Sequence, residues 1–340
     1  MLNNLYLCAM IFTSIFGLLM IVGLVMSLRG DRLRDFSVDN TLALRGVLAV
    51  SIVLFHYCCF YHPRWVPLFK NSGAYICGAF FLMSGYGIGK SWKQRGDAYL
   101  RHFWQGRLGT LLPVWLTTSA VCAIMRIDNT GIGIREQLHM WITNGDTLSY
   151  FTWFIDVLMV CYVSFYLSAR ILKHPGRVIV ALWILTLGQI LLFRYGGGHY
   201  YAWYISQLAM PVGFTIALYE QLLTKRRIYP LAICCLIGFI AAFYLYEYTG
   251  RILIWIAAIT LFSAMLYFMV RFGITLNNKP LKYLGTISLE IYVIHGLLTE
   301  MAWKAALAPR YALCVMLVGG IVAAAVFHTI TSRAKEYLCR

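Results

Sequence analysis

Long apolar segments follow one another along almost the whole chain, and no other feature limits the possible folds so strongly. A helix needs about 20 mainly apolar residues to cross a bilayer. Segments of this kind occupy eleven positions: 5–28, 41–61, 72–90, 108–126, 149–170, 177–194, 200–220, 228–247, 251–271, 284–303 and 309–330. The connections are short, the longest being 127–148, and leave no room for a soluble domain. We therefore predict an all-α, polytopic transmembrane helical bundle of about eleven helices, forming one domain over residues 1–340.

The composition agrees with a surface that faces lipid. Only 12% of the residues are charged, whereas soluble domains carry roughly 25%. The net charge of +16 would suit a nucleic-acid binder, but the basic residues form short clusters between apolar segments and no continuous basic face. Anionic lipid headgroups are natural partners for such clusters. We predict a multi-pass protein of the cell membrane, in a bacterium the inner or plasma membrane, with no nucleic-acid partner.

The first apolar segment and the cysteines exclude two other classes of feature. Residues 5–28 lack a basic n-region and a small-residue cleavage site, and they are too long for a signal-peptide core. We expect a spanning helix that stays in the protein. Most of the ten cysteines lie within apolar segments, and none forms a C-x-x-C pair. We interpret them as small packing residues and predict no metal site.

The orientation in the membrane follows from the distribution of basic residues. Twenty of the 29 Lys and Arg residues lie on alternate connections and the C-terminal tail, and eight lie on the opposite set. Cytoplasmic loops carry the excess of Lys and Arg. We therefore predict that the N-terminus lies outside and the C-terminus in the cytoplasm, as an odd number of spans requires.

Segment 41–61 carries two ionisable residues in apolar surroundings. Arg45 and His56 are eleven residues apart, which is close to three helical turns, so both project from nearly the same face with about 16 Å between them along the axis. Ionisable groups in the hydrocarbon region usually face a cavity, and we predict a shared tunnel. The alternative is a snorkelling arginine near the cytoplasmic end and a hydrogen-bonded structural histidine in the outer half.

Two further segments carry polar residues within predicted spans. Glu290, Tyr292 and His295 share one apolar helix, with His295 near mid-membrane. Trp153 and Asp156 lie one turn apart in the outer half of another helix. The carboxylate could orient an imidazole, bind a sugar hydroxyl or serve as a paired structural group, and the sequence does not choose between these roles.

The residue types indicate a class of chemistry. An imidazole in a membrane cavity suits general-base activation of a hydroxyl. An arginine on the cytoplasmic side suits a phosphate-bearing donor. Together they indicate transfer of a group from a charged cytosolic carrier to an acceptor reached from the other face, and their spacing leaves the group open.

Four motifs occur in an order typical of one known family. They are an Arg, ten residues, His pair at Arg45 and His56; FFLMSGY at 80–86; a WF pair beginning at Trp153; and an S-x-x-x-Y-x-x-H element at Ser288, Tyr292 and His295. In this ordered set the chain resembles the membrane acyltransferase family 3. The resemblance covers 41–330 and implies a ten-helix core preceded by one extra helix, 5–28.

The resemblance implies transfer of an acyl group, commonly acetyl, from acetyl-CoA or another acyl-CoA to a hydroxyl of an extracytoplasmic carbohydrate. Together with the positions above, it predicts catalytic residues His56, His295 and Asp156; donor-binding residues Arg45, Arg107 and Arg101; and substrate-binding residues Trp153, Ser84, Tyr86, Glu290 and Tyr292. Acetyl or succinyl as the group, direct transfer or an acyl-enzyme, and the identity of the acceptor stay open.

The chain departs from the family pattern at two positions. Leu42 stands where the family often has an aspartate, three residues before the motif arginine. Arg107 matches the first member of an R-x-x-R pair that precedes a proline, but Thr110 replaces the second. We expect Arg101 to compensate for that second cation.

Two other classes of function compete with the enzyme. A transporter would export a glycan or a small solute without covalent change, and such proteins often show broken helices at matching positions of two halves. Pro113 and Pro211 show no such pairing. A non-catalytic partner in polysaccharide assembly is the third class.

Overall fold

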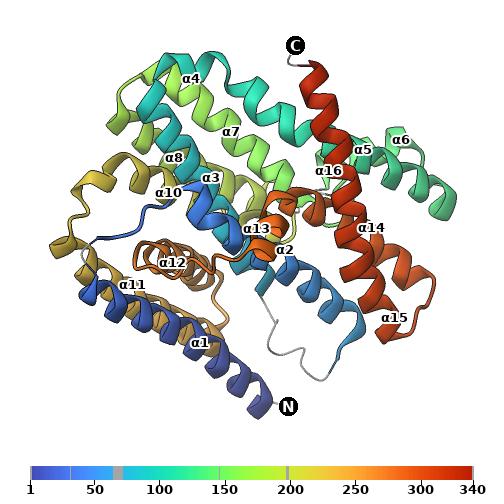
Figure 1. The fold of residues 1–340 in the computed structure, drawn as a ribbon. Coiled ribbons are helices and arrows are strands. Elements are labelled where there is room, and N and C mark those ends of the chain that lie inside the picture. The colour runs from blue at the N-terminus through green and yellow to red at the C-terminus, as the bar shows by residue number, and fades with distance from the viewer. Residues whose placement is uncertain (1, 31, 64–71, 145, 197–198, 339–340) are drawn as a thin grey trace.

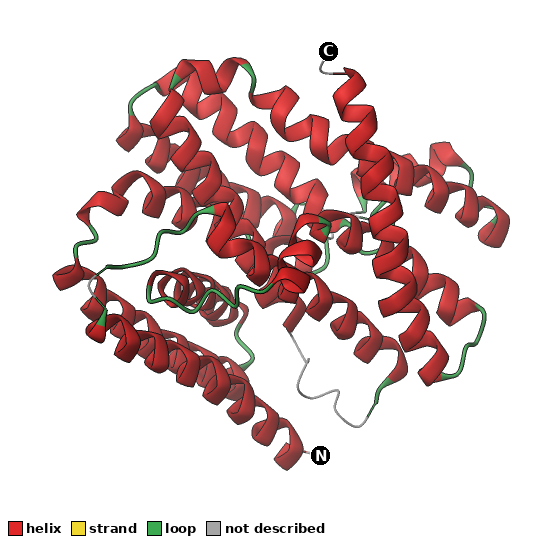
Figure 2. Cartoon of the chain, viewed as in Figure 1, coloured by secondary structure: helices red, strands yellow, loops and turns green. Residues whose placement is uncertain are grey.

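The structure is a computed structural model that describes residues 2–30, 32–63, 72–144, 146–196 and 199–338, with side chains described from 11 to 332 except 12. All regular structure in these ranges is helical (Figure 1 and Figure 2). The α-helices are α1 Leu2–Arg29, α2 Val38–Tyr61, α3 Ser72–Arg95, α4 Asp97–Arg101, α5 Phe103–Thr130, α6 Ile134–Thr143, α7 Trp153–Leu172, α8 Pro175–Tyr195, α9 Ala202–Ile205, α10 Ala209–Tyr219, α11 Lys225–Thr249, α12 Ile252–Arg271, α13 Lys279–Thr286, α14 Ser288–Lys304, α15 Pro309–Cys314 and α16 Gly320–Leu338.

Seven of the described helices are long and apolar enough to cross a membrane. They are α2, α5, α7, α8, α11, α12 and the continuous rod Pro309–Ser332 that joins α15 to α16 through a π-helical turn at Val315–Gly319. The prediction of an all-helical, multi-pass membrane protein is confirmed.

Several predicted boundaries are wrong. The connection 127–148 is not a plain loop: α5 continues to Thr130, ends at Gly131 with φ +72°, and is followed by α6. Segment 149–170 begins with a turn, and its helix starts only at Trp153. A glycine adopts the left-handed conformation that ends a helix without a steric cost, which accounts for the end of α5.

Two of the predicted spans are broken rather than continuous. Segment 200–220 consists of α9 and α10, and Pro211 lies in the first turn of α10, where its missing N–H costs nothing. Segment 284–303 divides at Ile287 into α13 and α14. The Thr286 hydroxyl donates a hydrogen bond to the Tyr283 carbonyl at 2.6 Å, and local bonds of this kind compete with the helical ladder.

Helix α1 shows how the bundle meets lipid. It lies along α11 and α12 (Figure 1). Its buried positions recur every three or four residues, at Thr13, Gly17, Met20, Gly23 and Ser27. The remaining face is also apolar, yet Leu18 is 61% exposed. A soluble helix would place polar residues on that face, so an apolar exposed face indicates contact with acyl chains.

Close glycine contacts hold the central helices together. Gly85 on α3 and Gly213 on α10 face one another's backbones, because an added Cβ would meet the carbonyl of Met210 or of Leu82. Gly46 on α2 and Gly285 on α13 form an equivalent contact. Small residues allow membrane helices to approach closely. The glycine of the FFLMSGY motif is therefore a packing residue.

We expect Gly85→Ala to destabilise the bundle. The added methyl group would collide with rigid backbone, and overpacking of this kind costs about 1–3 kcal/mol. Thermal unfolding of the detergent-solubilised protein measures the effect as a lower midpoint. Gly188→Ala on α8 is the control, because nothing lies within 4 Å of an added Cβ there; an equal loss in both variants would contradict the close-contact explanation.

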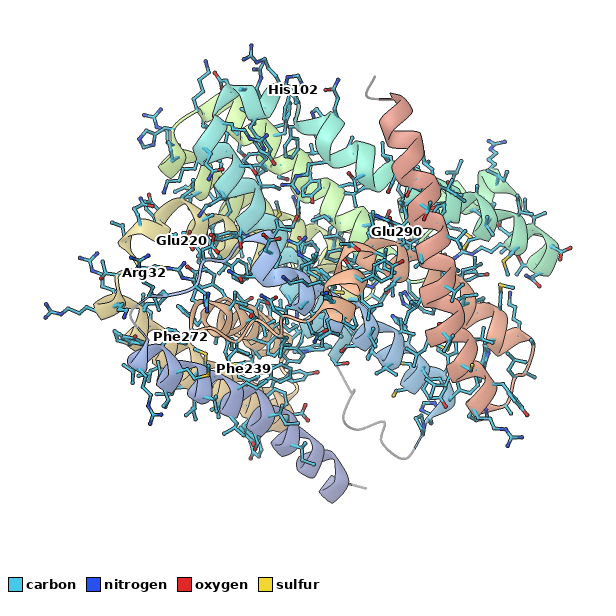
Figure 3. The ribbon with its side chains drawn as sticks, in the orientation of Figure 1. Arg32, His102, Glu220, Phe239, Phe272 and Glu290 are labelled. Carbon is cyan, nitrogen blue, oxygen red and sulfur yellow. The ribbon has the colours of Figure 1, made fainter. Side chains whose placement is uncertain are left out.

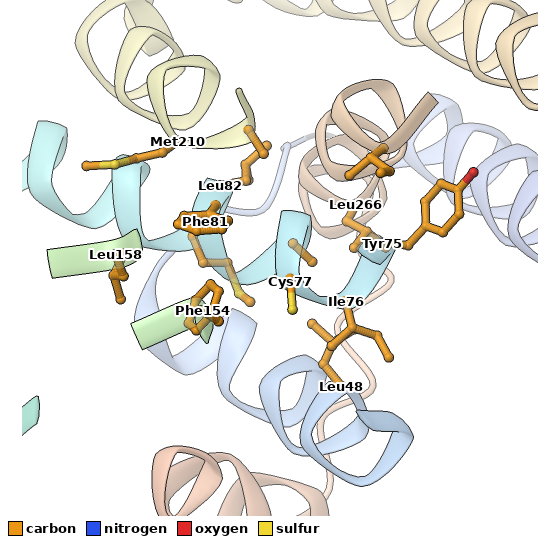
Figure 4. Close-up of a cluster of buried hydrophobic side chains, with 14 of the residues drawn as sticks. Leu48, Tyr75, Ile76, Cys77, Phe81, Leu82, Phe154, Leu158, Met210 and Leu266 are labelled. Atoms are coloured by element: carbon orange, nitrogen blue, oxygen red, sulfur yellow. The ribbon is translucent and has the colours of Figure 1, made fainter. Parts of the chain in front are cut away.

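The buried core surrounds α3. Side chains from α2, α3, α7, α10 and α12 meet in the cluster drawn in Figure 4, including Leu48, Phe81, Leu158, Met210 and Leu266. Phe81 and Phe154 pack edge to face with ring centroids 4.6 Å apart. This packing fixes the position of α7 against α3, and both helices contribute to the cavities described below.

The connections rich in basic residues meet at one end of the bundle. Lys225 donates to the carbonyl of Gly30 at 2.7 Å, the Arg34 amide donates to the carbonyl of Arg271 at 2.9 Å, and Lys93 donates to the carbonyl of Leu218 at 2.7 Å. This clustering agrees with the predicted alternation of the loops. Part of the unequal distribution of Lys and Arg residues depends on residues 64–71 and on side chains beyond 332, which lie outside the described residues. The assignment of this end to the cytoplasm stays a prediction.

Candidate active site

Arg45 opens into a cavity of about 320 Å³ among α2, α3, α5, α7 and α14. The polar side chains of its wall are Arg45, Ser84, Ser91, Arg107, Tyr162, Ser288 and Tyr292. Arg45 and Arg107 come from helices far apart in the sequence, and the fold brings both to this cavity. The predicted donor-binding pair is therefore assembled in space.

Neither arginine of this cavity has a carboxylate partner. The ion pairs of the described residues join Lys90 and Arg271 to Glu220, Lys304 to Glu300, and His328 to Glu290. Arg107 instead donates to the Tyr99 hydroxyl at 3.2 and 3.1 Å, and the Arg45 Nε has no hydrogen-bond partner. Charged groups inside a membrane protein are normally paired. Two cations in one cavity without a carboxylate suit an anionic ligand.

A second cavity, of about 310 Å³, adjoins the first at Arg45. It lies between the start of α2 and the end of α3. Its polar wall residues are Asp35, Ser37, Thr41, Arg45, Tyr86, Lys90, Ser91 and Gln94, of which Lys90 is paired with Glu220. It therefore leads from the basic end of the bundle to Arg45.

His56 opens into a different cavity, of about 280 Å³, lined mainly by aromatic side chains. Phe151 lies against the His56 ring with centroids 4.4 Å apart, and Trp153, Tyr200 and Tyr292 belong to the same wall. Figure 1 shows α2 within the bundle. Arg45 is the eighth and His56 the nineteenth of the 24 residues of α2, so they lie in opposite halves of the helix.

Tyr292 separates the His56 cavity from the Arg45 cavity and belongs to the wall of both. Its hydroxyl donates to the Phe151 carbonyl at 2.8 Å. Phe151 has φ +60°, a strained value for an aromatic residue. The prediction of one open tunnel is wrong in this respect: there are two cavities with a tyrosine between them.

The two predicted catalytic histidines lie side by side. The rings of His56 and His295 have centroids 4.9 Å apart. The His295 Nδ1 is bonded to the Tyr292 carbonyl, and its Nε2 has no partner. A carbonyl can only accept, so Nδ1 carries the proton and Nε2 offers a lone pair. His295 can therefore accept a proton from a neighbouring group.

A glycine allows the strained turn to reach this pair. An added Cβ at Gly296 would meet the Tyr150 carbonyl, so the turn that carries Phe151 packs directly on α14. The position of Phe151 over His56 depends on this contact.

The other predicted residues are spread over three environments. Ser84 lies in the Arg45 cavity, 2.7 Å from the Tyr162 hydroxyl. Trp153 lines the His56 cavity. Arg101 is exposed and belongs to none of the cavities described here, so the structure does not bring it to Arg45.

Tyr86 and Glu290 are each held by a charged or titratable partner. The Tyr86 hydroxyl donates to Glu220 at 2.7 Å, within a cluster that also contains Lys90 and Arg271. Glu290 on α14 accepts from His328 on α16 at 2.7 Å (Figure 3). Both bonds join helices across the bundle, although Tyr86 also borders the cavity that leads to Arg45.

Asp156 lies apart from the histidines. It lines a fourth cavity, and no hydrogen bond joins it to His56 or His295. The sequence reasoning also missed Tyr99, Tyr162 and Phe151. Tyr99 and Tyr162 lie at the Arg107 side chain. Nothing in the sequence distinguishes these two tyrosines from those that only pack in the core.

Comparison with known proteins identifies the family. No curated protein matches the chain, and no solved structure matches it. A family model described as an acyltransferase domain matches residues 38–330, which is most of the chain and begins after α1. The chain is an acyltransferase and belongs to acyltransferase family 3.

Proposed function

We propose that this acyltransferase takes an acyl group, acetyl in the first instance, from acyl-CoA and transfers it to a hydroxyl of an extracytoplasmic carbohydrate. The observation that carries the proposal is the pair of arginines without carboxylate partners in one cavity, separated by a single tyrosine from the cavity of His56. A cavity that suits an anion, followed by a cavity that contains a base, suits a donor with phosphates at one end and a reactive thioester at the other.

The cavities suggest how the donor would lie. Lys90 and Arg45 line the entrance from the basic end, where the nucleotide phosphates of CoA would bind. Arg107 would hold a further anionic group of the donor. The long arm of CoA would then extend between Ser84 and Tyr162 toward Tyr292, and the thioester would meet His56 beyond it.

The chemistry assigns one role to each histidine. His56 removes the proton from an attacking hydroxyl, the oxygen adds to the thioester carbonyl, and collapse of the intermediate breaks the C–S bond. The thiolate of CoA then takes the proton from His56. His295, fixed by the Tyr292 carbonyl, would support the charged form of His56 through its free Nε2. In the alternative route, the His56 nitrogen attacks the thioester, the C–S bond breaks and CoA leaves as the thiolate. The acceptor hydroxyl then takes the acyl group from His56 and gives its proton to the thiolate.

Family membership favours covalent transfer over transport of an unchanged solute. The breaks at α9–α10 and α13–α14 resemble the discontinuous helices of transporters. Among them only α14 borders the Arg45 cavity, whereas α9 and α14 both border the His56 cavity. Counterflow of an unmodified solute would be the observation in favour of a transporter.

Sealed membrane vesicles of both orientations test the proposal. We expect labelled acetyl-CoA added outside inside-out vesicles to label a membrane or luminal glycan, and right-side-out vesicles to remain unlabelled, because the basic end is proposed to face the cytoplasm. Mass analysis of the surface glycans with and without the protein should differ by one acyl unit. Succinyl-CoA is the parallel donor, and membranes without the protein are the control. Absence of a covalent acyl product with either donor would contradict the proposal.

A further inference from the structure

A fourth cavity, of about 470 Å³, lies between α6, α7 and α8 and the segment 199–203. We call it the lateral cavity. Its polar and aromatic lining residues are Trp141, Asp156, Phe193, His199 and Trp203, and its other apolar lining residues are Ile142, Met159, Val160, Val163 and Leu192. The donor route described above does not use it.

Asp156 is the unusual residue of the lateral cavity. It is only 5% exposed, and neither carboxylate oxygen accepts a hydrogen bond of normal length and angle. The indoles of Trp115 and Trp141 lie close enough to interact with the carboxylate. A buried polar group left without a partner costs about 1–3 kcal/mol, so the cavity offers a strong acceptor to a ligand.

The wall also offers an unused donor. The buried indole Nε1 of Trp203 has no hydrogen-bond partner. A ligand that satisfies both Asp156 and Trp203 must donate to one and accept from the other, and hydroxyl groups do both. The aromatic faces of Trp141 and Trp203 provide flat apolar surfaces beside these polar groups, as is typical of small-molecule sites.

The charge of the lateral cavity selects among hydroxyl-bearing ligands. No lysine or arginine lines it, and Asp156 is its carboxylate. A phosphate or carboxylate headgroup would meet the like charge of Asp156, and the wall offers it the His199 imidazole but no lysine or arginine. An uncharged sugar ring fits.

The apolar part of the cavity indicates how such a sugar arrives. Val160, Val163 and Leu192 are 39%, 43% and 62% exposed on two helices that are apolar enough to span the membrane. An exposed apolar face on such helices is in contact with lipid. A ligand whose sugar sits at Asp156 can therefore keep its hydrocarbon chains in the bilayer along α7 and α8.

The lateral cavity also adjoins the His56 cavity. On α7, Trp153 lines the His56 cavity, and Asp156, one turn later, lines the lateral cavity. In the segment 199–203, Tyr200 lines the His56 cavity, and His199 and Trp203 line the lateral cavity. The same two short stretches of chain therefore separate the two cavities.

We infer that the lateral cavity binds the uncharged glycosyl headgroup of a membrane lipid, and that this glycolipid is the acceptor presented to His56. The inferred binding of a glycolipid depends only on the structure of the cavity, whereas its role as the acceptor rests on the proposed function.

Photo-crosslinking in nanodiscs tests the binding without any acyl-CoA. The probe is a monoglucosyl diacylglycerol with a diazirine in its acyl chain. We expect crosslinked peptides to come from α6, α7, α8 and 199–203. Unlabelled monoglucosyl diacylglycerol should compete at least ten-fold better than phosphatidylglycerol with the same chains, and soluble methyl glucoside should compete poorly.

Two variants probe the two halves of the cavity. Asp156→Leu keeps the size of the side chain and removes the acceptor, so crosslinking should fall roughly ten-fold. Val163→Trp fills the lipid-facing part at an exposed position and should give a similar loss with an unchanged unfolding temperature. Glu300→Gln, a surface residue paired with Lys304, should label as the wild type does.

Equal competition by phosphatidylglycerol, or full labelling of both variants, would overturn the glycolipid site. Competition by methyl glucoside as strong as by the glycolipid would overturn the lipid-borne part of the inference. Because no donor is present, these results are independent of the vesicle experiment: the glycolipid can fail to bind while acyl transfer to another acceptor proceeds.

Discussion

Replacement of His56 by alanine is expected to reduce acyl transfer by about 10²–10⁴-fold, the range that a positioned general base contributes. His56 is the imidazole on the wall of the aromatic cavity beyond Tyr292, and the ring of His295 lies beside it with centroids 4.9 Å apart. Removal of the imidazole takes away the proton acceptor and leaves the Arg45 cavity intact. Labelled acetyl-CoA supplied to membranes that contain equal amounts of wild type and variant measures the change.

A donor-binding measurement separates this loss from misfolding. His56→Ala should bind acyl-CoA within about two-fold of the wild type, because the two arginines are unaltered and a loss of only the transition-state interaction lowers turnover without raising KM. His139→Ala, an exposed histidine on α6, is the matched control and should transfer normally. Equal transfer by wild type and His56→Ala would remove the catalytic role.

The second histidine allows a sharper test of the pair. If His56 and His295 act as one unit, the double variant should be little worse than His56→Ala alone, because groups that act together are not additive. Independent structural roles would give losses that multiply.

Substitution of Arg45 or Arg107 by alanine is expected to weaken acyl-CoA binding by roughly 10- to 100-fold each, since a hydrogen bond to a charged group contributes about 1.5–3 kcal/mol. The two guanidinium groups share one cavity without any carboxylate among the described ion pairs. An anionic donor is therefore the counter-charge that this cavity lacks. Isothermal titration calorimetry of the purified protein with acyl-CoA gives the dissociation constant directly.

Arg101→Ala provides the matched control on the same side of the bundle. Arg101 is exposed on α4 and is absent from the cavity, so its loss should change donor binding by less than about two-fold, as for a screened surface charge. Equal losses in the Arg45, Arg107 and Arg101 variants would indicate a diffuse basic surface and would contradict a defined anion site. Arg45→Lys should recover part of the affinity, because it restores the charge without the fork of donors.

Several features of the site could be predicted because they depend on one helix at a time. The spacing of Arg45 and His56 on α2 follows from helical geometry alone, and the structure places both on cavity walls. Trp153 and Asp156, expected one turn apart on a single helix, both lie on α7. Apolar length likewise predicted most of the spans.

Features that depend on two or more segments could not be predicted. The ring of Tyr292 divides the predicted tunnel because a turn 141 residues earlier provides the Phe151 carbonyl for its hydroxyl. Arg101 and Asp156 were expected at the site from their position in the chain, yet the packing of their helices turns one to the surface and the other into the lateral cavity.

The sequence by itself determined an all-helical membrane protein, the axial separation of its cation and its imidazole, and the excess of basic residues on alternate loops. These properties depend on transfer free energies and on the geometry of single helices, which nearby residues set. Only the tertiary structure decided which side chains share a cavity. That choice depends on backbone contacts such as Gly85 with Met210 and Gly285 with Leu42, where segments distant in the chain meet in an arrangement that no local pattern encodes.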